Sequence, residues 1–336
     1  MAVIPPKVAV EAGVVDPDER WIVERALYGL PSSPADWGAF RDSRLKLMEW
    51  EKEDGKYRLQ PTHESNLWQV VRVKAGSSEE VAGYLAVYVD DLLAAGPDDV
   101  VEGCLARILK EWQRSAPEYI CEDSWLEFCG FELRYSEGRG KTFIAQPSYV
   151  KELLQRHAVT RSRPVPFVKP SSEEAPEVSP EAIRRAQGLV GELLWLSIRS
   201  RPDLAYGVSW MSQNITKNPE AVEKVGREML EYLHGTSEVG LMYEPCEENH
   251  GVEDELAFRR TTQRLEVFAD ISFAPEGAVS HQGILATYGG KTVQWESGKQ
   301  AFATLSTAEA ELLGYCEGML VGDSLASILS LFEGGL

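Results

Sequence analysis

The feature that most constrains the fold is a pair of apolar runs with two acidic residues between them. Val81–Val89 is rich in Val and Tyr and alternates loosely, and a second short run, Leu92–Ala95, is closed by a Gly-Pro pair. Both patterns are typical of β-strands. Asp90 and Asp91 separate the two runs, which predicts an antiparallel hairpin with both acids at its turn. Because helical patterns follow farther along the chain, we expect an α+β fold.

Length and charge narrow the classes of function. With 336 residues and 43% hydrophobic composition, the chain is long enough for about two domains. Acidic residues outnumber basic ones by 53 to 34, for a net charge of −19. This balance disfavours attraction of the whole surface to phosphate backbones or anionic lipids, so a nucleic-acid role must depend on local patches.

Cellular location is indicated by what the sequence lacks. Its uninterrupted apolar stretches fall short of the ~20 residues that a bilayer span needs, and the N-terminus shows no secretory signal. The five cysteines include no C-x-x-C pair, which supports neither a disulfide framework nor a zinc knuckle. We therefore expect an intracellular, reducing location and no membrane partner.

Two interruptions of the apolar periodicity suggest domain boundaries. Residues 163–180 contain five prolines, and residues 245–260 are dominated by acids. These stretches predict three domains, at residues 1–160, 161–245 and 260–336. After the hairpin, we expect the first domain to contain, in chain order, Asp98 and Asp99 as caps of a helix over 100–112, strands over 126–135 and 141–144, and a helix over 148–157.

The middle domain is predicted to be helical. Ser179 before Pro180 and Asn218 before Pro219 are helix-start signals, and a further helix is expected to begin at Arg201 and Pro202. The helix that starts at Asn218 is expected to end at His234 and Gly235. The predicted buried stripe of the first of these helices consists of Ile183, Ala186, Val190, Leu193 and Leu194.

The third domain is predicted to place strands before one long helix. A strand over 265–269 ends at Asp270, and a hairpin over 283–296 turns at two glycines. Ser306 and Glu309 then form a capping box that opens a helix toward Leu331, with the Glu309 carboxylate bonded to the Ser306 amide.

Two pairs of acids are candidates for metal chemistry. Mg²⁺ accepts one or two carboxylates and takes its other ligands from phosphates and water. Asp90 and Asp91 could supply these carboxylates, with Asp90 the better ligand because neighbours in a strand point to opposite faces. The alternative is a polar turn. Asp270 and Glu311 could converge on two metal ions, or they could be a turn acid and a solvated helix acid.

Several motifs are similar to one family. They are Tyr88-Val89-Asp90-Asp91, the segment over 25–37 with its Leu-Tyr-Gly-Leu, Ser-Pro and Trp, the Arg-Pro-Asp-Leu-Ala of 201–205, the Tyr-Leu-His-Gly-Thr of 232–236, and the Leu-Ser-Thr-Ala-Glu-Ala-Glu of 305–311. Through these motifs nearly the whole chain resembles the Pol polyprotein of Copia-type retrotransposons.

The resemblance implies a fold and an activity. It implies a partial reverse-transcriptase palm over 1–160, a helical thumb or connecting region over 161–245, and the N-terminal half of a ribonuclease H-like α/β fold over 260–336. The implied enzyme is an RNA-directed DNA polymerase with ribonuclease H, using Mg²⁺ or Mn²⁺. The implied partners are an RNA or DNA template-primer, deoxynucleotides and other Pol or capsid-like parts, and the implied location is the cytoplasm, a virus-like particle or the nucleus.

The same resemblance assigns site residues. The catalytic and metal-binding acids are Asp90, Asp91, Asp270 and Glu311, and the nucleotide- or template-binding residues are Tyr28, Gly29, Pro34 and Tyr88. Gly29 is expected to permit close backbone approach, and Pro34 to fix the next turn. Local positive densities that could follow a nucleic-acid backbone, or could be solvated helix faces, comprise Arg156, Arg161, Arg163, Lys169, Arg184, Arg185, Arg199 and Arg201.

The sequence also departs from the family pattern. Relatives need a further polymerase aspartate before the segment over 25–37 and a third ribonuclease H acid after the last helix. Asp323 is rejected as that third acid because it falls within the helical stripe. We therefore expect a chain truncated at both ends with impaired sites. The alternatives are a non-catalytic remnant that binds protein or nucleic acid, and a fragment with no stable fold.

Overall fold

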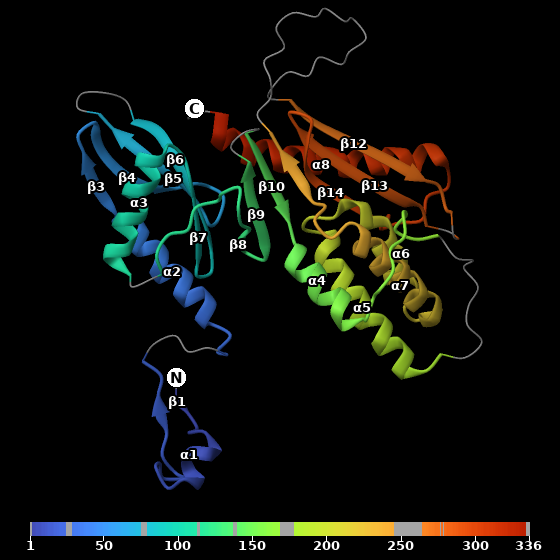
Figure 1. Ribbon diagram of the computed structural model, residues 1–336, viewed down its shortest axis with the longest axis horizontal. Helices are drawn as coiled ribbons and strands as arrows, with labels where there is room; N and C mark the ends of the chain where they lie inside the picture. The colour runs from blue at the N-terminus through green and yellow to red at the C-terminus, as the bar shows by residue number, and fades with distance from the viewer. Residues whose placement is uncertain are drawn as a thin grey trace, which may run out of the picture. The chain divides into compact units, whose positions relative to one another are not determined.

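The computed structural model describes residues 2–24, 29–74, 79–112, 115–136, 140–168, 178–244, 264–275, 277 and 279–333 (Figure 1). The chain forms two compact units, residues 1–117 with 331–336, and residues 118–330. Both contain helices and antiparallel strands, so the α+β class is confirmed. The division after Pro117 does not coincide with the domain end predicted at residue 160, and the predicted domains themselves stay a prediction.

The first unit is built on a five-stranded antiparallel sheet. Its strands, in spatial order, are β3 (Glu49–Lys52), β4 (Gly55–Pro61), β5 (Leu67–Val73), β6 (Glu79–Tyr88) and β7 (Asp91–Ala95). The helices α2 (Ser33–Leu45) and α3 (Asp98–Glu111) contribute apolar side chains to the same core as the sheet. A small piece precedes them, with β1 (Ala2–Val3), α1 (Lys7–Glu11) and β2 (Trp21–Ile22). The predicted hairpin of β6 and β7 is confirmed.

One expectation for this unit is wrong. Asp98 and Asp99 do not cap α3, because Pro97 holds the cap position and no side-chain capping bond is present there. Both acids lie in the first turn, where their charge is favourable near the positive end of the helix dipole. Asp99 also accepts a hydrogen bond from Lys52 Nζ at 2.6 Å, and this contact holds the pKa of the Asp99 carboxyl below its usual value.

The second unit contains a four-stranded antiparallel sheet. Its strands, in spatial order, are β11 (Leu241–Tyr243), β10 (Lys141–Ala145), β9 (Phe131–Ser136) and β8 (Leu126–Phe128). The single strand predicted over 126–135 is therefore two strands. Cys129 and Gly130 separate them and have positive φ angles of 55° and 75°. Two successive residues with positive φ form a tight two-residue turn between the strands.

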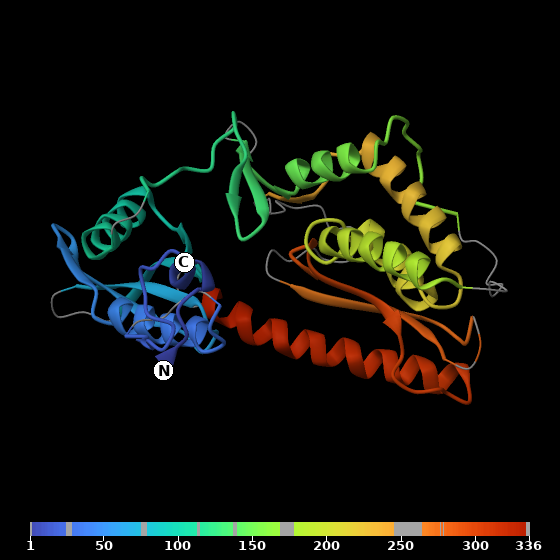
Figure 2. The ribbon, with the colours of Figure 1, turned by 90° about the horizontal axis from the view of Figure 1, so that it is seen from below.

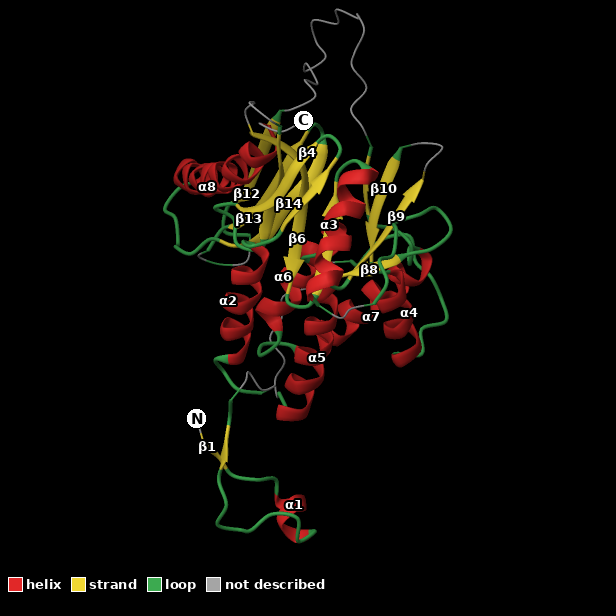
Figure 3. Cartoon of the chain, turned by 90° about the vertical axis from the view of Figure 1, so that its left-hand side faces the viewer, coloured by secondary structure: helices red, strands yellow, loops and turns green. Residues whose placement is uncertain are grey.

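In chain order, a group of helices lies between β10 and β11 (Figure 3). It comprises α4 (Pro147–Arg156), α5 (Pro180–Ser197), the short 3₁₀ helix η2 (Pro202–Leu204), α6 (Ala205–Asn214) and α7 (Pro219–Gly235). Both predicted start signals are confirmed, because Ser179 Oγ accepts from the Ala182 amide and Asn218 Oδ1 from the Ala221 amide. Of the predicted stripe, Leu194 is wrong, since it is 41% exposed.

The last part of this unit is a three-stranded antiparallel sheet with one long helix. The strands β12 (Leu265–Ser272), β13 (His281–Tyr288) and β14 (Lys291–Lys299) pair in sequence order. The helix α8 (Thr307–Glu333) runs along this sheet, and its residues up to Ser330 belong to this unit (Figure 2). It approaches β12 closely, because a Cβ at Gly314 would lie 2.2 Å from Ile271 Cδ1.

The predicted capping box at the start of α8 is present with one difference. Ser306 Oγ accepts from the Glu309 amide at 3.2 Å, as the motif predicts. The Glu309 carboxylate, however, accepts from the amide of Leu305 at 2.7 Å, one residue earlier than expected. The hydrogen bond back from Glu309 is therefore made to the residue before the cap residue Ser306, and the helix still begins at Thr307.

The apolar character of α8 is greater than the short uninterrupted runs of the sequence indicated. Over Thr307–Phe332 an 18-residue window has a mean hydropathy of 1.3, and 11% of that window is buried. By length and composition alone, this helix could cross a membrane. Core helices of soluble proteins satisfy the same criterion, so the finding carries no membrane assignment.

Candidate functional site

The hairpin of β6 and β7 presents the predicted acids at a two-residue turn. Tyr88 pairs with Asp91, which leaves Val89 and Asp90 as the turn residues. The side chains of all four residues are exposed. Val89 has a positive φ of 49°, a rare conformation for a β-branched residue and a local source of backbone strain. The tip of the hairpin is therefore a strained turn that exposes two neighbouring carboxylates.

The helix α2 holds this turn from one side. The indole Nε1 of Trp37 donates to the carbonyl oxygen of Val89 at 3.2 Å, and the Arg41 guanidinium donates to the same oxygen at 3.5 Å. Trp37 and Arg41 are four residues apart and so share one face of the helix. Two donors from one helix face thus fix the backbone of the strained residue.

Arg41 is central to this anchoring although the sequence analysis did not identify it. Its side chain is 5% exposed. It donates to Asp42 Oδ1 at 2.9 Å and to Asn66 Oδ1 at 2.8 Å, while the Asn66 carbonyl accepts from the Val87 amide at 2.8 Å. A buried charge is tolerated when it is paired and hydrogen-bonded. The spacing from Trp37 was the one signal in the sequence that could have indicated this role.

The other residues predicted beside this hairpin have mixed outcomes. Gly29 has a φ of +90°, and no atom of the residues that the structure describes lies within 4 Å of the position of a Cβ. Its backbone conformation accounts for the glycine, and the expected close approach to a bound nucleotide or template stays a prediction. Pro34 is the second residue of α2, so it begins a helix instead of fixing a turn. Tyr28 lies outside the described residues.

The hairpin acids have the chemistry that a divalent cation requires. Asp90 and Asp91 are adjacent and exposed, and Mg²⁺ is bound in proteins by one or two carboxylates together with water and phosphate oxygens. Within the part of the chain that the structure describes, no group of three or more His, Cys, Asp or Glu side chains is placed to hold a metal ion. Metal binding at the hairpin stays a prediction.

The second predicted pair of acids comes from β12 and α8. Asp270 lies inside β12, which continues two residues farther than expected, to Ser272. The neighbouring Ile271 is 8% exposed and packs on Gly314 of α8. Because side chains alternate along a strand, Asp270 points to the sheet face opposite α8.

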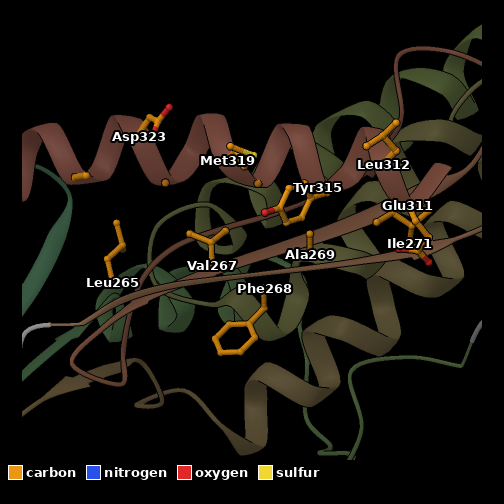
Figure 4. Close-up of a pocket in the computed structure, with 13 residues that line it drawn as sticks. Leu265, Val267, Phe268, Ala269, Ile271, Glu311, Leu312, Tyr315, Met319 and Asp323 are labelled. Atoms are coloured by element: carbon orange, nitrogen blue, oxygen red, sulfur yellow. The ribbon is translucent and has the colours of Figure 1, made fainter. Parts of the chain in front are cut away.

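Glu311 lies on the other side of the same strand. It lines an open groove of about 880 Å³ between β12 and α8, close to Ile271 (Figure 4). The groove is otherwise mostly apolar, and its one other acid is Asp323, which is a helix residue as predicted. Asp270 is not among the residues that line it. Asp270 and Glu311 therefore do not share this groove, and their convergence on metal ions stays a prediction.

Two of the sequence motifs meet in the helical group. Arg201 is 1% exposed. Its guanidinium bonds to Asp203 at 2.7 Å and donates to both the carbonyl oxygen and Oγ1 of Thr236, each at 2.9 Å. The motifs over 201–205 and 232–236 thus form one buried polar connection between η2 and the end of α7.

The predicted positive densities are largely neutralised. Within the described ranges, the arginines at 156, 161, 163, 184, 185 and 201 each contact a carboxylate. Arg199 stacks on the Trp195 ring at 3.8 Å and donates to the Cys129 carbonyl oxygen at 2.6 Å. Lys169 lies outside the described residues. These side chains therefore serve mainly structural contacts, and whether they follow a nucleic-acid backbone stays a prediction.

Comparisons with known proteins give relatives but no family model and no solved structure. The retrovirus-related Pol polyprotein from transposon TNT 1-94 of Nicotiana tabacum is 24% identical over 306 residues, which cover 88% of this chain and 21% of that protein. A putative transposon Ty5-1 protein of Saccharomyces cerevisiae is 24% identical over 320 residues, which cover 91% of this chain and 90% of that protein. The Pol polyprotein from transposon RE1 of Arabidopsis thaliana is 25% identical over 311 residues, with 89% and 19% covered. The chain thus spans about a fifth of two of these relatives.

Proposed function

We infer the function of this chain from its family, the Pol polyproteins of Copia-type retrotransposons, to which it is related over about 89% of its length. We propose that it carries the reverse-transcriptase and ribonuclease H region of such a polyprotein. The proposed reactions are RNA-directed DNA synthesis at the β6–β7 hairpin and hydrolysis of the RNA strand of hybrids by the β12–α8 part.

The observation that carries the polymerase proposal is the anchored hairpin. Two motifs far apart in the sequence meet there, since Trp37 from the motif segment over 25–37 donates to the turn of Tyr88-Val89-Asp90-Asp91. Two exposed neighbouring carboxylates on a turn held by a helix form a support for a cation and for the phosphates that the cation binds.

Each residue of the hairpin then has a proposed role. Asp90 and Asp91 would hold Mg²⁺ or Mn²⁺, which supplies charge stabilisation for a phosphoryl group in transfer. Tyr88, 47% exposed at the end of β6, would contact the template or the nucleotide. Trp37 and Arg41 would position these groups by fixing the Val89 carbonyl. Gly29, in a backbone conformation that glycine adopts readily, would let the template strand of the nucleic acid lie close to the backbone of this segment.

The ribonuclease H proposal has a different support. Three antiparallel strands followed by one long helix agree with the N-terminal half of that fold, and the helix begins at the Ser306 and Glu309 capping box of the family motif. Asp270 and Glu311 are the proposed metal-binding acids. The proposed partners are a template-primer, deoxynucleotides and other Pol or capsid-like parts, in the cytoplasm, a virus-like particle or the nucleus.

We further propose that both activities are impaired. Two-metal catalysis clamps the attacking and leaving oxygens between two ions held by several carboxylates. Among the residues that the structure describes, neither pair of acids is joined by a third metal-ligating side chain. Loss of one such arm is expected to remove much of the stabilisation of the transition state.

A primer-extension assay tests the polymerase proposal. We expect slow incorporation of deoxynucleotides on a primed RNA template, dependent on Mg²⁺ or Mn²⁺ and reduced about 100-fold or more by Asp90→Asn. Asp98→Asn is the matched control, because it removes an exposed acid from the same unit outside the hairpin. Equal rates for the wild-type chain and Asp90→Asn would contradict the polymerase site. Fast, processive synthesis would contradict only the impairment.

A second candidate function is a protein-binding module. It is favoured by the exposed apolar side chains on one helix, α8, where Leu312, Tyr315, Met319 and Leu320 are each more than half exposed. Large exposed apolar surfaces commonly mark interaction sites. Binding to an RNA–DNA hybrid that weakens steeply with salt would favour the nucleic-acid function over this one.

A further inference from the structure

A second cavity in the same unit has a lining of another character. It lies between α6 and the three-stranded sheet and has a volume of about 110 Å³. One proline and six polar or aromatic side chains line it, namely Tyr206, Trp210, Gln213, Ser272, His281 and Lys299. No Asp or Glu is among them. The cavity is therefore rich in groups that can donate a hydrogen bond and contains no carboxylate of its own.

Regular secondary structure builds this lining. Ser272 pairs with His281, and His281 pairs with Lys299, so these three residues form one row across the sheet. Cβ atoms of directly opposed residues are about 4.5–5.5 Å apart. Tyr206, Trp210 and Gln213 recur along α6 at the spacing of one helix face. Two rigid elements thus present their polar side chains to one another.

The charge of the lining contrasts with the rest of the protein. Lys299 makes no ion pair with any residue in the described ranges, although the chain has 53 acidic residues and most arginines of this unit are paired. His281 is oriented by a 2.9 Å hydrogen bond between its Nε2 and Ser297 Oγ, and by edge contact with the Tyr206 ring at 5.2 Å. A lysine kept away from carboxylates beside an ordered imidazole favours an anionic ligand.

Trp210 supplies an independent observation. The residue is 3% exposed, and its Nε1 is buried with no hydrogen-bond partner in the part of the chain described. An indole N–H can only donate a hydrogen bond, and no residue that the structure describes accepts one from Trp210. Buried donors without partners are uncommon in native proteins, and an ordered water or a bound ion is a common explanation.

The size of the cavity limits what the ligand can be. Pockets for drug-sized molecules are about 300–1,000 Å³, several times the volume found here. We propose that the cavity binds a phosphate group, whose oxygen atoms accept hydrogen bonds from Lys299, Trp210, Gln213 and Ser272. The group is either a free phosphate or a phosphodiester of a polynucleotide.

The position of the cavity suggests what a bound phosphodiester of a polynucleotide would do. Asp270 lies two residues before Ser272 on the same strand and on the same sheet face. Two residues of a strand span about 6.8 Å, so a backbone phosphate held here would place its polynucleotide beside the candidate acid. This role depends on the proposed ribonuclease H function, whereas the phosphate site itself does not.

Indole resonances of the full chain provide the test. We would label the tryptophans with ¹⁵N, assign the Trp210 indole signal with Trp210→Phe, and titrate with inorganic phosphate against chloride at equal ionic strength. We expect a saturable shift of that signal with phosphate only. Lys299→Gln is expected to weaken binding at least tenfold, and Lys217→Gln, an exposed lysine just after α6, to leave it unchanged.

A second set of measurements separates the outcomes. A short RNA–DNA hybrid that shifts the Trp210 signal and competes with phosphate identifies the phosphodiester as the ligand, and a response to inorganic phosphate alone identifies free phosphate. If Lys299→Gln does not fold, as judged by thermal unfolding, Ser272→Ala replaces it with the same expected direction. The absence of a saturable shift, an equal response to chloride, or unchanged binding in the folded variant would overturn the proposal. None of these readouts depends on catalytic activity.

Discussion

The two pairs of acids that carry the proposed chemistry are built in different ways. Asp90 and Asp91 are neighbours in the sequence, and a two-residue turn brings both to the tip of one hairpin. Asp270 and Glu311 come from a strand and a helix separated by two further strands. The first pair depends on local geometry, whereas the second depends on how α8 packs on β12 and on which sheet face each side chain occupies.

This difference shows that a sequence specifies site residues in a turn better than site residues in a strand. A turn between two apolar runs fixes the position of its residues within a few ångströms. A strand position fixes a side chain only to one of two faces, and a shift of one residue exchanges them. Asp270 illustrates the second case, since β12 continues past it to Ser272 and places it on the face opposite the helix that bears Glu311.

The Asp270 and Glu311 pair depends on the packing of α8 on β12, and Gly314→Leu should disrupt this packing. A Cβ at this position would already lie 2.2 Å from Ile271 Cδ1 and 2.6 Å from its Cγ1. We expect a loss of about 3 kcal/mol in the free energy of unfolding of the second unit, because overpacking forces the helix away from the strand. Hydrogen exchange should increase in β12 and in the part of α8 that packs on it.

Gly318→Ala is the matched control for this substitution. A Cβ there would meet Ala269 and Val267 at 3.5 Å, which is ordinary contact. Replacing glycine by alanine in a helix interior then stabilises by about 0.5–1 kcal/mol. Destabilisation of the same size by both variants would show that α8 does not approach β12 most closely at Gly314.

Much of the fold could be predicted because its signals are local. The caps at Ser179 and Asn218 and the hairpin of β6 and β7 were identified correctly from a few neighbouring residues each. The predictions that were wrong depended on contacts or on backbone angles. The turn at Cys129 requires two successive positive φ angles, and only one of its two residues is a glycine. Leu194 has the periodicity of the buried stripe but is 41% exposed.

The candidate site was predictable in its acids and not in its supports. Asp90 and Asp91 follow from the strand pattern, but the anchoring by Arg41 joins residues 48 positions apart through a backbone carbonyl. The four-residue spacing from Trp37 is the one sequence signal for this contact, and no motif marks it because a carbonyl oxygen is present in every residue. The cavity between α6 and the three-stranded sheet could not be predicted either, because only the cross-strand register brings Ser272 beside His281 and Lys299.

The anchoring by α2 can be tested with Arg41→Met, which keeps most of the buried side-chain volume but removes the donors. We expect a loss of about 2 kcal/mol in the stability of the first unit, because the hydrogen bonds to Asn66 and Val89 disappear. Denaturant unfolding measures this loss, and hydrogen exchange of the β6 and β7 amides shows whether it occurs at the hairpin. Arg184→Met is the control, as its pair with Glu181 is exposed at both ends and is expected to contribute less than about 0.5 kcal/mol. Equal losses in both variants would show that Arg41 does not anchor the hairpin.

The smallest expected effect concerns the strain at the hairpin tip itself. Val89 has a φ of 49° and is 56% exposed, so Val89→Asn relieves an unfavourable backbone conformation while it gives up little apolar burial. We expect the first unit to gain up to about 1 kcal/mol, because asparagine tolerates the left-handed region far better than a β-branched residue. Val89→Ile retains the branched Cβ and should show no gain. A loss of stability in Val89→Asn, measured by denaturant unfolding beside the isoleucine control, would show that side-chain contacts of Val89 outweigh the strain, and the hairpin would then depend on packing as the β12–α8 pair does.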